Sequence, residues 1–282
     1  MTSGKPVVQP AAPASPAFGT PSAIRSLISF FDKTLTIADL EVRKLRHDPT
    51  ELLTRAVQPA LWLLVFGEVL AKTRAIPSGN LSYRAFLAPG ILAQSVVFSA
   101  IFYGIAVIWE RDLGIIHKFL VSPTPRAALV LGKAVSASIR GLAQGVIVYI
   151  IALLLGVHMN WSIGALAGVI ALVFLGGSLF ATFSLIIACL VRTRERFMGI
   201  GQVLTMPLFF ASSAIYPISI MPRWLQVIAH VNPLTYEVDG LRALMPHGGT
   251  SQLGLGLDFA VLTAGMLLLV AIGSRLYPRV AQ

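Results

Sequence analysis

The sequence predicts an all-α integral membrane protein with six transmembrane helices, and three observations support this. The chain is 56% hydrophobic and only 12% charged, about half the charged fraction of a typical soluble domain. Its apolar residues form long runs separated by short basic segments, so the net charge of +10 indicates membrane topology rather than nucleic-acid binding. Residues 141–191 contain no Lys, Arg, Asp or Glu. As one helix this stretch would be about 76 Å long, so it must fold back across a hydrocarbon core of about 30 Å.

Two segments precede the first span. Residues 1–22 are rich in Pro, Ala, Ser and Gly, which predicts a disordered tail rather than a cleaved signal peptide. Residues 23–48 place apolar side chains at steps of three and four, with charged side chains on the other face. This helix is too polar to cross a membrane, so we expect it to lie in the membrane interface. A soluble helix packed on a partner is the alternative.

Residues 49–282 form the predicted transmembrane domain. The six expected spans cover residues 55–71, 85–109, 129–157, 161–191, 197–215 and 255–277. The third and fourth spans form a hairpin, because residues 158–161 are the only polar bend in the uncharged stretch. Basic residues gather at the ends that hold 43–55, 111–126, 192–196 and 275–279. The positive-inside rule therefore places both termini in the cytoplasm.

A charged island, residues 110–126, separates the second and third spans and is named here the coupling segment. It reads ERDLGIIHKFLVSPTPR, and its first three residues close the preceding apolar run. The following apolar residues predict a short helix, which Pro123 and Pro125 end. A short helix at a membrane surface suits docking to another protein and transmitting its movement. An ordinary loop between two spans is the alternative.

A second unusual stretch, residues 216–247, lies between the fifth and sixth spans and is named here the outer hairpin. It contains two short helical faces, with a turn at Asn232-Pro233 and a charged set of Glu237, Asp239 and Arg242 in the second half. Neither half can cross a membrane, so we expect a re-entrant pair of helices at the mouth of a translocation path. An outer cap without a gating role is the alternative.

The sequence predicts no catalytic residue, no metal site and no cofactor on this chain. Its five histidines and Cys189 lack metal-ligand spacing, and neither a G-x-S-x-G motif nor a G-x-x-x-x-G-K-[ST] phosphate loop is present. Glu68, Lys133 and Arg140 are ionisable residues inside expected spans, which makes them suspect, but each lies close enough to a span end to snorkel. Glu68 is the intramembrane candidate of the three. The uncharged polar residues of the spans either line a path or link helices: Gln94, Ser95, Ser99, Gln144, Ser178, Ser184, Gln202, Thr205, Ser212 and Ser213.

Two segments, taken together, resemble a known family. The coupling segment continued by Leu131-Gly132-Lys133, and PLFFASSAIYPISIMPRWLQVIAHVNPLTYEVDGLRAL, resemble ABC-2 type permeases of ATP-binding-cassette exporters. The daunorubicin-resistance-like and nodulation-type subgroup is the most similar, and the resemblance covers nearly the whole chain after residue 25. It implies that the coupling segment docks in a groove of an ATPase subunit through Glu110, Arg111, Gly114, Phe119, Leu120, Ser122 and Pro123. It also implies that the outer hairpin narrows the exit through Pro217, Pro222, Asn232, Pro233, Tyr236 and Arg242.

The resemblance implies a permease subunit of an ATP-driven exporter in the bacterial plasma membrane, moving amphipathic drug or lipid-like cargo outward. ATP and Mg would be bound by a separate nucleotide-binding subunit. The permease would pair with a second copy or a close relative, among membrane lipids and without nucleic acid. Export of a lipid-linked polysaccharide or another envelope glycan is the alternative within this machinery. An intramembrane enzyme, or a channel without an ATPase, is the alternative from a different class.

Overall fold

The computed structural model describes residues 39, 54, 57–73, 76–79, 81–114, 126–191 and 193–277. Within these ranges the chain forms helices and turns, with no strand and one isolated bridge between Met159 and Pro246. The predicted all-α fold is therefore confirmed for this part of the chain. The expected tail and, apart from Asp39, the expected interface helix lie outside the described residues.

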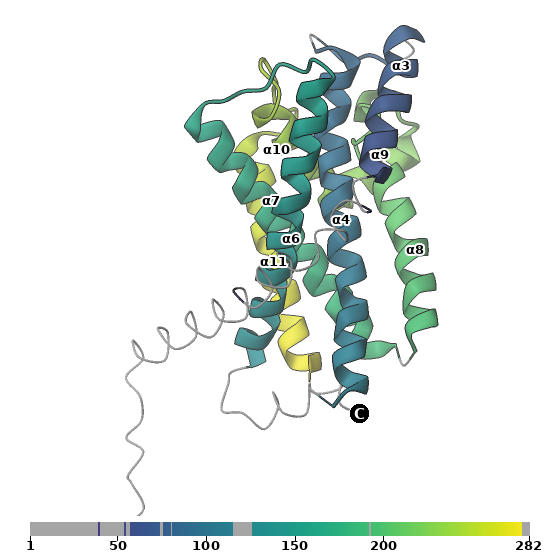
Figure 1. Cartoon of the computed structure of the whole chain (residues 1–282), viewed down its shortest axis with the longest axis vertical. Coiled ribbons are helices and arrows are strands. Elements are labelled where there is room, and N and C mark those ends of the chain that lie inside the picture. Colours follow the sequence, from purple (N-terminus) through teal and green to yellow (C-terminus); the bar gives the residue numbers. More distant parts are fainter. Residues whose placement is uncertain are drawn as a thin grey trace, which may run out of the picture.

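Four helices of the described part are long and apolar enough to cross a membrane. They are α4 (Tyr83–Asp112), α6 (Arg126–Leu154), α7 (Ile163–Leu190) and α11 (Leu255–Leu276). All four run along the long axis of the molecule in Figure 1, and α7 packs against the other three. The α6–α7 pair forms a hairpin whose connection, residues 155–162, includes the expected polar bend.

Shorter helical segments lie near the first and fifth expected spans. Residues 57–61 are helical and lead into the π-helix η1 (Trp62–Phe66) and then α3 (Gly67–Thr73). α8 (Arg194–Phe210) packs mainly against α4. Neither segment reaches the length of the four long helices, so the count of six spans stays a prediction.

The fifth expected span, 197–215, is wrong at its C-terminal end. α8 stops at Phe210, and residues 211–216 form a turn, named here the 211–216 turn. Pro207 lies in the last part of α8 and has no N–H with which to continue the helical ladder. Ser212 Oγ then donates to the Phe209 carbonyl at 2.7 Å, which gives the backbone a local alternative to helix.

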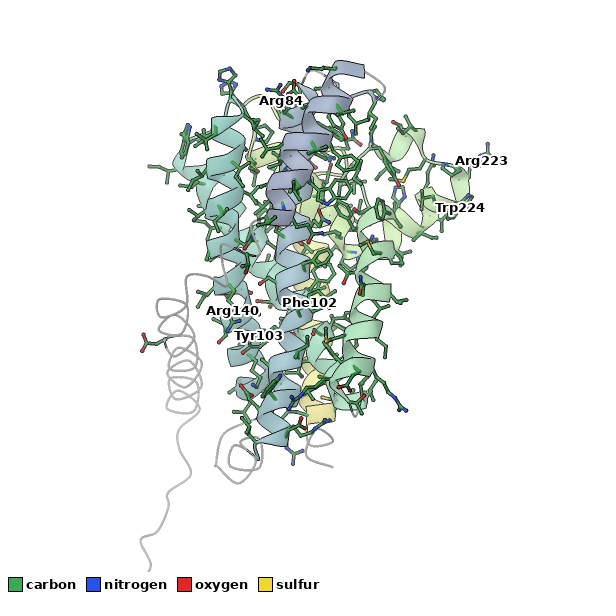
Figure 2. All side chains as sticks on the ribbon, turned by 45° about the vertical axis from the view of Figure 1, so that its right-hand side comes forward. Arg84, Phe102, Tyr103, Arg140, Arg223 and Trp224 are labelled. Carbon is green, nitrogen blue, oxygen red and sulfur yellow. The ribbon has the colours of Figure 1, made fainter. Side chains whose placement is uncertain are left out.

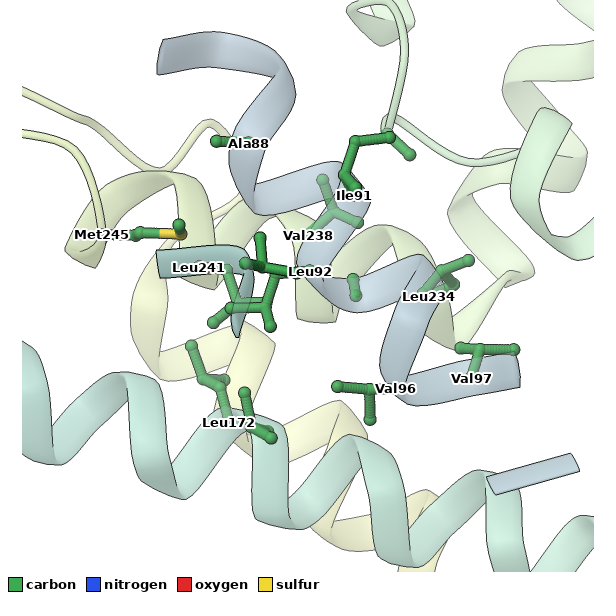
Figure 3. Packing of buried hydrophobic residues seen from close by; sticks show 14 of the residues in the cluster. Ala88, Ile91, Leu92, Val96, Val97, Leu172, Leu234, Val238, Leu241 and Met245 are labelled. Carbon is green, nitrogen blue, oxygen red and sulfur yellow. The ribbon is translucent and has the colours of Figure 1, made fainter. Parts of the chain in front are cut away.

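The outer hairpin contains η2 (Ile218–Ile220), α9 (Arg223–Val231) and α10 (Pro233–Leu244). α10 packs into the core against α4 and α7, as Figure 3 shows for the fully buried Leu234, Val238, Leu241 and Met245. The apolar face of α9 points the other way. Trp224 is 66% exposed, and Figure 2 shows it projecting from the bundle.

The two unusual segments lie at opposite ends of the molecule. In Figure 1 the C-terminal end of α4 and the N-terminal end of α8 lie at the lower end. α3, α10 and the α6–α7 connection lie toward the upper end. The bundle therefore separates the start of the coupling segment from the outer hairpin by the length of its helices.

Candidate functional site

The last turn of α4 carries the ERD cluster, which is Glu110, Arg111 and Asp112. Glu110 forms an ion pair with Lys133 of α6. Arg111 donates to the carbonyl of Val191, directly after α7, at 3.1 Å. These contacts attach the end of α4 to two other helices.

The third member of the cluster reaches α8. Asp112 accepts a hydrogen bond at 2.7 Å from Arg194, whose guanidinium also lies 3.7 Å from the centre of the Trp109 ring. Cation–π contact and ion pairing both hold Arg194 against α4. The ERD cluster thus joins α4 to α6, α7 and α8 at the end where the coupling segment begins.

Gly114, which the family resemblance places in the coupling element, lies two residues after the end of α4 at Asp112. Gly114 has φ of +68°, and its N–H donates to the Arg111 carbonyl at 2.9 Å. Such left-handed residues commonly follow a helix, and glycine adopts them without steric strain. Phe119, Leu120, Ser122 and Pro123 lie outside the described residues.

The structure places Lys133 and Arg140, both on α6, against side chains of α4. The Lys133 side chain is 9% exposed and pairs with Glu110 instead of reaching solvent. Arg140 lies inside α6, with its guanidinium 5.5 Å from the centre of the Tyr103 ring (Figure 2). Lys133 therefore has an ion-pair partner on α4, and Arg140 has an aromatic contact there.

At the other end, side chains from the outer hairpin and α4 bind the backbone around the 211–216 turn. Asn232 Nδ2 donates to the carbonyls of Leu208, at 2.7 Å, and Ala211, at 3.3 Å. Arg242 donates to the Ser213 carbonyl at 2.6 Å. Tyr83 Oη of α4 donates to the Ile215 carbonyl at 3.1 Å. Non-helical backbone in a membrane protein requires partners of this kind.

The remaining outer-hairpin candidates shape the hairpin itself. Pro217 and Pro222 directly precede η2 and α9. Pro233 is the first residue of α10, where its missing N–H costs no hydrogen bond. Tyr236 Oη donates to the His230 carbonyl at 2.7 Å and so links α10 to α9. Of the six candidates, only Asn232 and Arg242 are brought to the 211–216 turn.

A polar pocket lies between α4, α6 and the helical residues near 58. Its volume is about 330 Å³. Its lining combines amides and hydroxyls with aromatic rings: Thr54, Gln58, Pro59, Gln94, Ser95, Phe98, Ser99, Phe102 and Gln144. The sequence left open whether these polar residues line a path or link helices. Gln94, Ser95, Ser99 and Gln144 line a cavity.

Other polar residues of the spans link helices or bond within their own helix. Ser138 of α6 and Ser178 of α7 are hydrogen-bonded at 2.8 Å, and Ser184 of α7 donates to the Ile101 carbonyl of α4. Thr205 donates to the Gly201 carbonyl of its own helix. The structure therefore divides one set of similar residues into two groups with different roles.

Glu68 takes part in an ion cluster near the upper end. Its carboxylate pairs with Arg84 and lies 3.5 Å from Lys72 Nζ. Arg84 also donates to the Leu155 carbonyl after α6 at 3.0 Å. The carboxylate of this intramembrane candidate therefore contributes to a link between α3, α4 and the α6–α7 connection.

Buried acidic side chains on α10 and α11 are further functional candidates, and the sequence noted Glu237 and Asp239 only as part of the charged set of the outer hairpin. Glu237 is fully buried against Gly176 of α7, and its carboxylate has no hydrogen-bond partner in the described ranges. Ser251 Oγ lies 2.7 Å from the Asp239 carboxylate and 3.2 Å from that of Asp258. A charge in a short helix usually indicates an exposed face, so the sequence carried no signal for this burial. Among the described residues, no group of three His, Cys, Asp or Glu side chains could hold a metal ion.

Comparison with known sequences shows the family of this chain. The profile of the ABC-2 type transporter family matches residues 33–245. The chain belongs to the ABC-2 type transporter family. The matched region includes the ERD cluster, every lining residue of the polar pocket and nearly all of the outer hairpin. Four long apolar helices make this ABC-2 protein a multi-pass membrane protein.

Several permease sequences are similar to this chain over most of its length. The ycf38 protein of Cyanophora paradoxa is 29% identical over 234 residues, which is 81% of this chain and 80% of that protein. The daunorubicin resistance ABC transporter permease protein DrrB1 of Streptomyces coeruleorubidus is 25% identical over 246 residues, covering 86% and 85%. The inner membrane transport permease YadH of Escherichia coli K12 is 26% identical over 200 residues, covering 68% and 73%.

Proposed function

We propose that this ABC-2 chain is the permease subunit of an ATP-driven exporter that moves amphipathic drug or lipid-like cargo outward across the bacterial plasma membrane. The observation that carries the proposal is the family match across residues 33–245. The positive-inside pattern supports an orientation with both termini and the ERD cluster at the cytoplasmic side.

The energy for transport would come from a partner. The sequence has no G-x-x-x-x-G-K-[ST] loop, so ATP and Mg would be bound by a separate ATPase subunit. Movement of the coupling segment would reach α6, α7 and α8 through the contacts of the ERD cluster. Two permease chains, identical or closely related, would pair with two ATPase chains.

The polar pocket is the proposed point of cargo contact. Its volume of about 330 Å³ lies within the range of about 300–1,000 Å³ that is usual for small-molecule sites. Amides and hydroxyls beside Phe98 and Phe102 suit a molecule with both polar and apolar parts. The pocket size favours small amphipathic cargo over a polysaccharide, and the name of DrrB1 supports a drug exporter.

The test is association with the ATPase and ATP-dependent transport in proteoliposomes. Replacing Phe119 and Leu120 by alanine would remove roughly 100–150 Å² of apolar contact surface, worth about 3 kcal/mol at about 25 cal/mol per Å². We expect co-purification with the ATPase to weaken on the order of a hundredfold, together with loss of transport.

Lys118→Ala is the matched control, since a charge at a protein surface usually contributes under about 1 kcal/mol and this change removes no apolar contact area. It should keep both association and transport. Association of the Phe119→Ala/Leu120→Ala variant at wild-type strength would contradict the assignment of the coupling segment. Transport that proceeds without any ATPase would contradict the ATP-driven exporter.

A further inference from the structure

Arg242 is a buried cation without a counter-ion in the part of the chain that the structure describes. It is 3% exposed and donates to the carbonyls of Ser213, at 2.6 Å, and Phe86, at 3.4 Å. Its guanidinium lies 3.8 Å from the centre of the Phe86 ring. Its second terminal nitrogen has no hydrogen-bond partner among the described residues. A buried charge without a paired anion is unfavourable, so its presence calls for an explanation.

The nearest acidic residue on α10 is already occupied. Asp239 accepts hydrogen bonds from the backbone N–H groups of Gln252, at 2.9 Å, and Leu253, at 2.8 Å, and its carboxylate lies 2.7 Å from Ser251 Oγ. It forms no ion pair with Arg242. α10 lies outside the four long apolar helices, and burial lowers the pKa of the Arg242 guanidinium to about 10, so the group keeps its charge at neutral pH.

Arg242 lines a cavity of about 230 Å³ at the upper end of the molecule. Two loops border this cavity, one before α4 and one before α11, and they contribute Ser78, Gly79, Thr250 and Gln252. No carboxylate of the described residues lines it. Since one water occupies about 30 Å³ in the liquid, the cavity has room for a small oxyanion with several waters.

The loop before α11 is closely fitted to Arg242. Gly248 has φ of +77°, a conformation that favours glycine. A side chain on Gly249 would overlap the carbonyl oxygen of Arg242. The loop therefore packs directly on the backbone of Arg242, which lines the cavity.

We propose that this outer cavity binds a phosphate group, held by the Arg242 guanidinium together with the Thr250 hydroxyl and the Gln252 amide. The Arg242 terminal nitrogen without a partner among the described residues can donate charge-assisted hydrogen bonds to phosphate oxygens, and such bonds are strong. The phosphate would provide the counter-ion that the described part of the protein does not. It comes from a lipid headgroup or from free phosphate, and the two sources are separated below. The site shares no residue with the polar pocket and does not depend on the transport proposal.

The experiment measures thermal unfolding of the purified full-length chain in an uncharged detergent, followed by tryptophan fluorescence. One series adds inorganic phosphate, and a second adds dihexanoyl phosphatidylglycerol. Sodium chloride at matched ionic strength and dihexanoyl glycerol, which lacks phosphate, are the controls. A ligand that binds only the folded state at a specific site raises the unfolding temperature, and the response to ligand concentration is saturable. We expect this with a phosphate-bearing probe and with neither control.

The response to the two probes identifies the source. Saturation with phosphatidylglycerol but not with inorganic phosphate assigns the site to a lipid headgroup, and saturation with inorganic phosphate assigns it to the free ion. If neither probe gives a saturable rise in the unfolding temperature, the proposal is overturned.

Variants test the residues. Thr250→Ala/Gln252→Ala changes two exposed side chains and keeps the Arg242 contacts, so it should fold. It should bind the effective probe roughly a hundredfold more weakly, because it loses two hydrogen bonds to a charged group. Arg242→Lys keeps the charge but loses the carbonyl contacts that position the guanidinium, so it should also weaken binding. Arg223→Gln, an exposed arginine on α9 (Figure 2), is the matched control and should bind as the wild type does. Wild-type affinity in Thr250→Ala/Gln252→Ala, or an equal loss in Arg223→Gln, would overturn the assignment.

Discussion

Asn232 connects the start of α10 to the end of α8 through one side chain. Its Oδ1 accepts from the Leu234 N–H at 3.0 Å, which caps α10. Its Nδ2 donates to two carbonyls, of Leu208 and Ala211, at the end of α8. The end of α8 is therefore stabilised by a residue more than twenty positions away in the sequence.

We expect Asn232→Ala to destabilise the protein by about 2 kcal/mol, because a helix cap contributes about 1 kcal/mol and each further hydrogen bond about 0.5–1.5 kcal/mol. The measurement is the free energy of unfolding in mixed detergent. Asn160→Ala is the control, since the Asn160 side chain accepts one exposed hydrogen bond, from the Ser162 N–H at 3.1 Å. Equal losses in the two variants would show that the links to α8 contribute nothing.

The Glu110–Lys133 ion pair is the second residue-scale feature with a measurable effect. Lys133→Met should cost on the order of 2 kcal/mol of unfolding free energy, because it leaves the Glu110 carboxylate, which is 23% exposed, without its partner. The double variant Glu110→Gln/Lys133→Met should recover most of that loss. A double variant as unstable as the sum of the two singles would mean that the pair contributes no coupling energy.

At the scale of elements, the packing of α4 against the 211–216 turn requires a residue without a side chain. A Cβ at Gly90 of α4 would overlap the backbone carbonyl of Ala214, which cannot move aside as a flexible side chain could. Gly199 of α8 has open space around it, and a Cβ added there would meet no other part of the described chain within 4 Å. Gly90 therefore allows α4 to approach the turn closely, whereas no neighbouring element of the described chain requires a glycine at position 199.

We expect Gly90→Ala to lower the unfolding temperature and to disturb the outer hairpin. Gly199→Ala should be neutral or stabilising by up to about 1 kcal/mol, because alanine is the better helix former. Thermal unfolding of the two purified variants measures the change in stability. Limited proteolysis of the outer hairpin shows whether Gly90→Ala disturbs it. A Gly90→Ala protein as stable as Gly199→Ala would contradict the close approach of α4 to the turn.

At the scale of the whole molecule, the two ends of the bundle should face opposite sides of the membrane. Cys189 is the only cysteine, so a Cys189→Ser background allows single cysteines to be added at exposed sites. We expect an impermeant reagent added to intact cells to label His158→Cys and His247→Cys, and to label Glu195→Cys only after the membrane is opened. Labelling of Glu195→Cys in intact cells would reverse the orientation.

The membrane class, the four long helices and the positions of the two unusual segments could be predicted from the sequence. These features depend on composition, on runs of apolar residues and on prolines, which act locally. The buried face of α10 was also readable, since Leu234, Val238, Leu241 and Met245 follow a helical period. The same periodicity in α9 produced an apolar face that the structure leaves exposed at Trp224 and Val231. Periodicity identifies a face, but it does not identify what covers it.

Only the tertiary structure decided how polar groups are satisfied. Gln94 and Ser184 are both uncharged polar residues in apolar helices, yet one lines a cavity and the other bonds to α4. Lys133 finds Glu110, 23 positions away, and Arg242 reaches Ser213 and Phe86 while no carboxylate of the described ranges pairs with it. Buried polar groups must take their partners from whatever the fold brings near them. Those partners are distant in sequence and leave no local pattern, so the sequence determined where the helices lie and the fold determined what their polar side chains do.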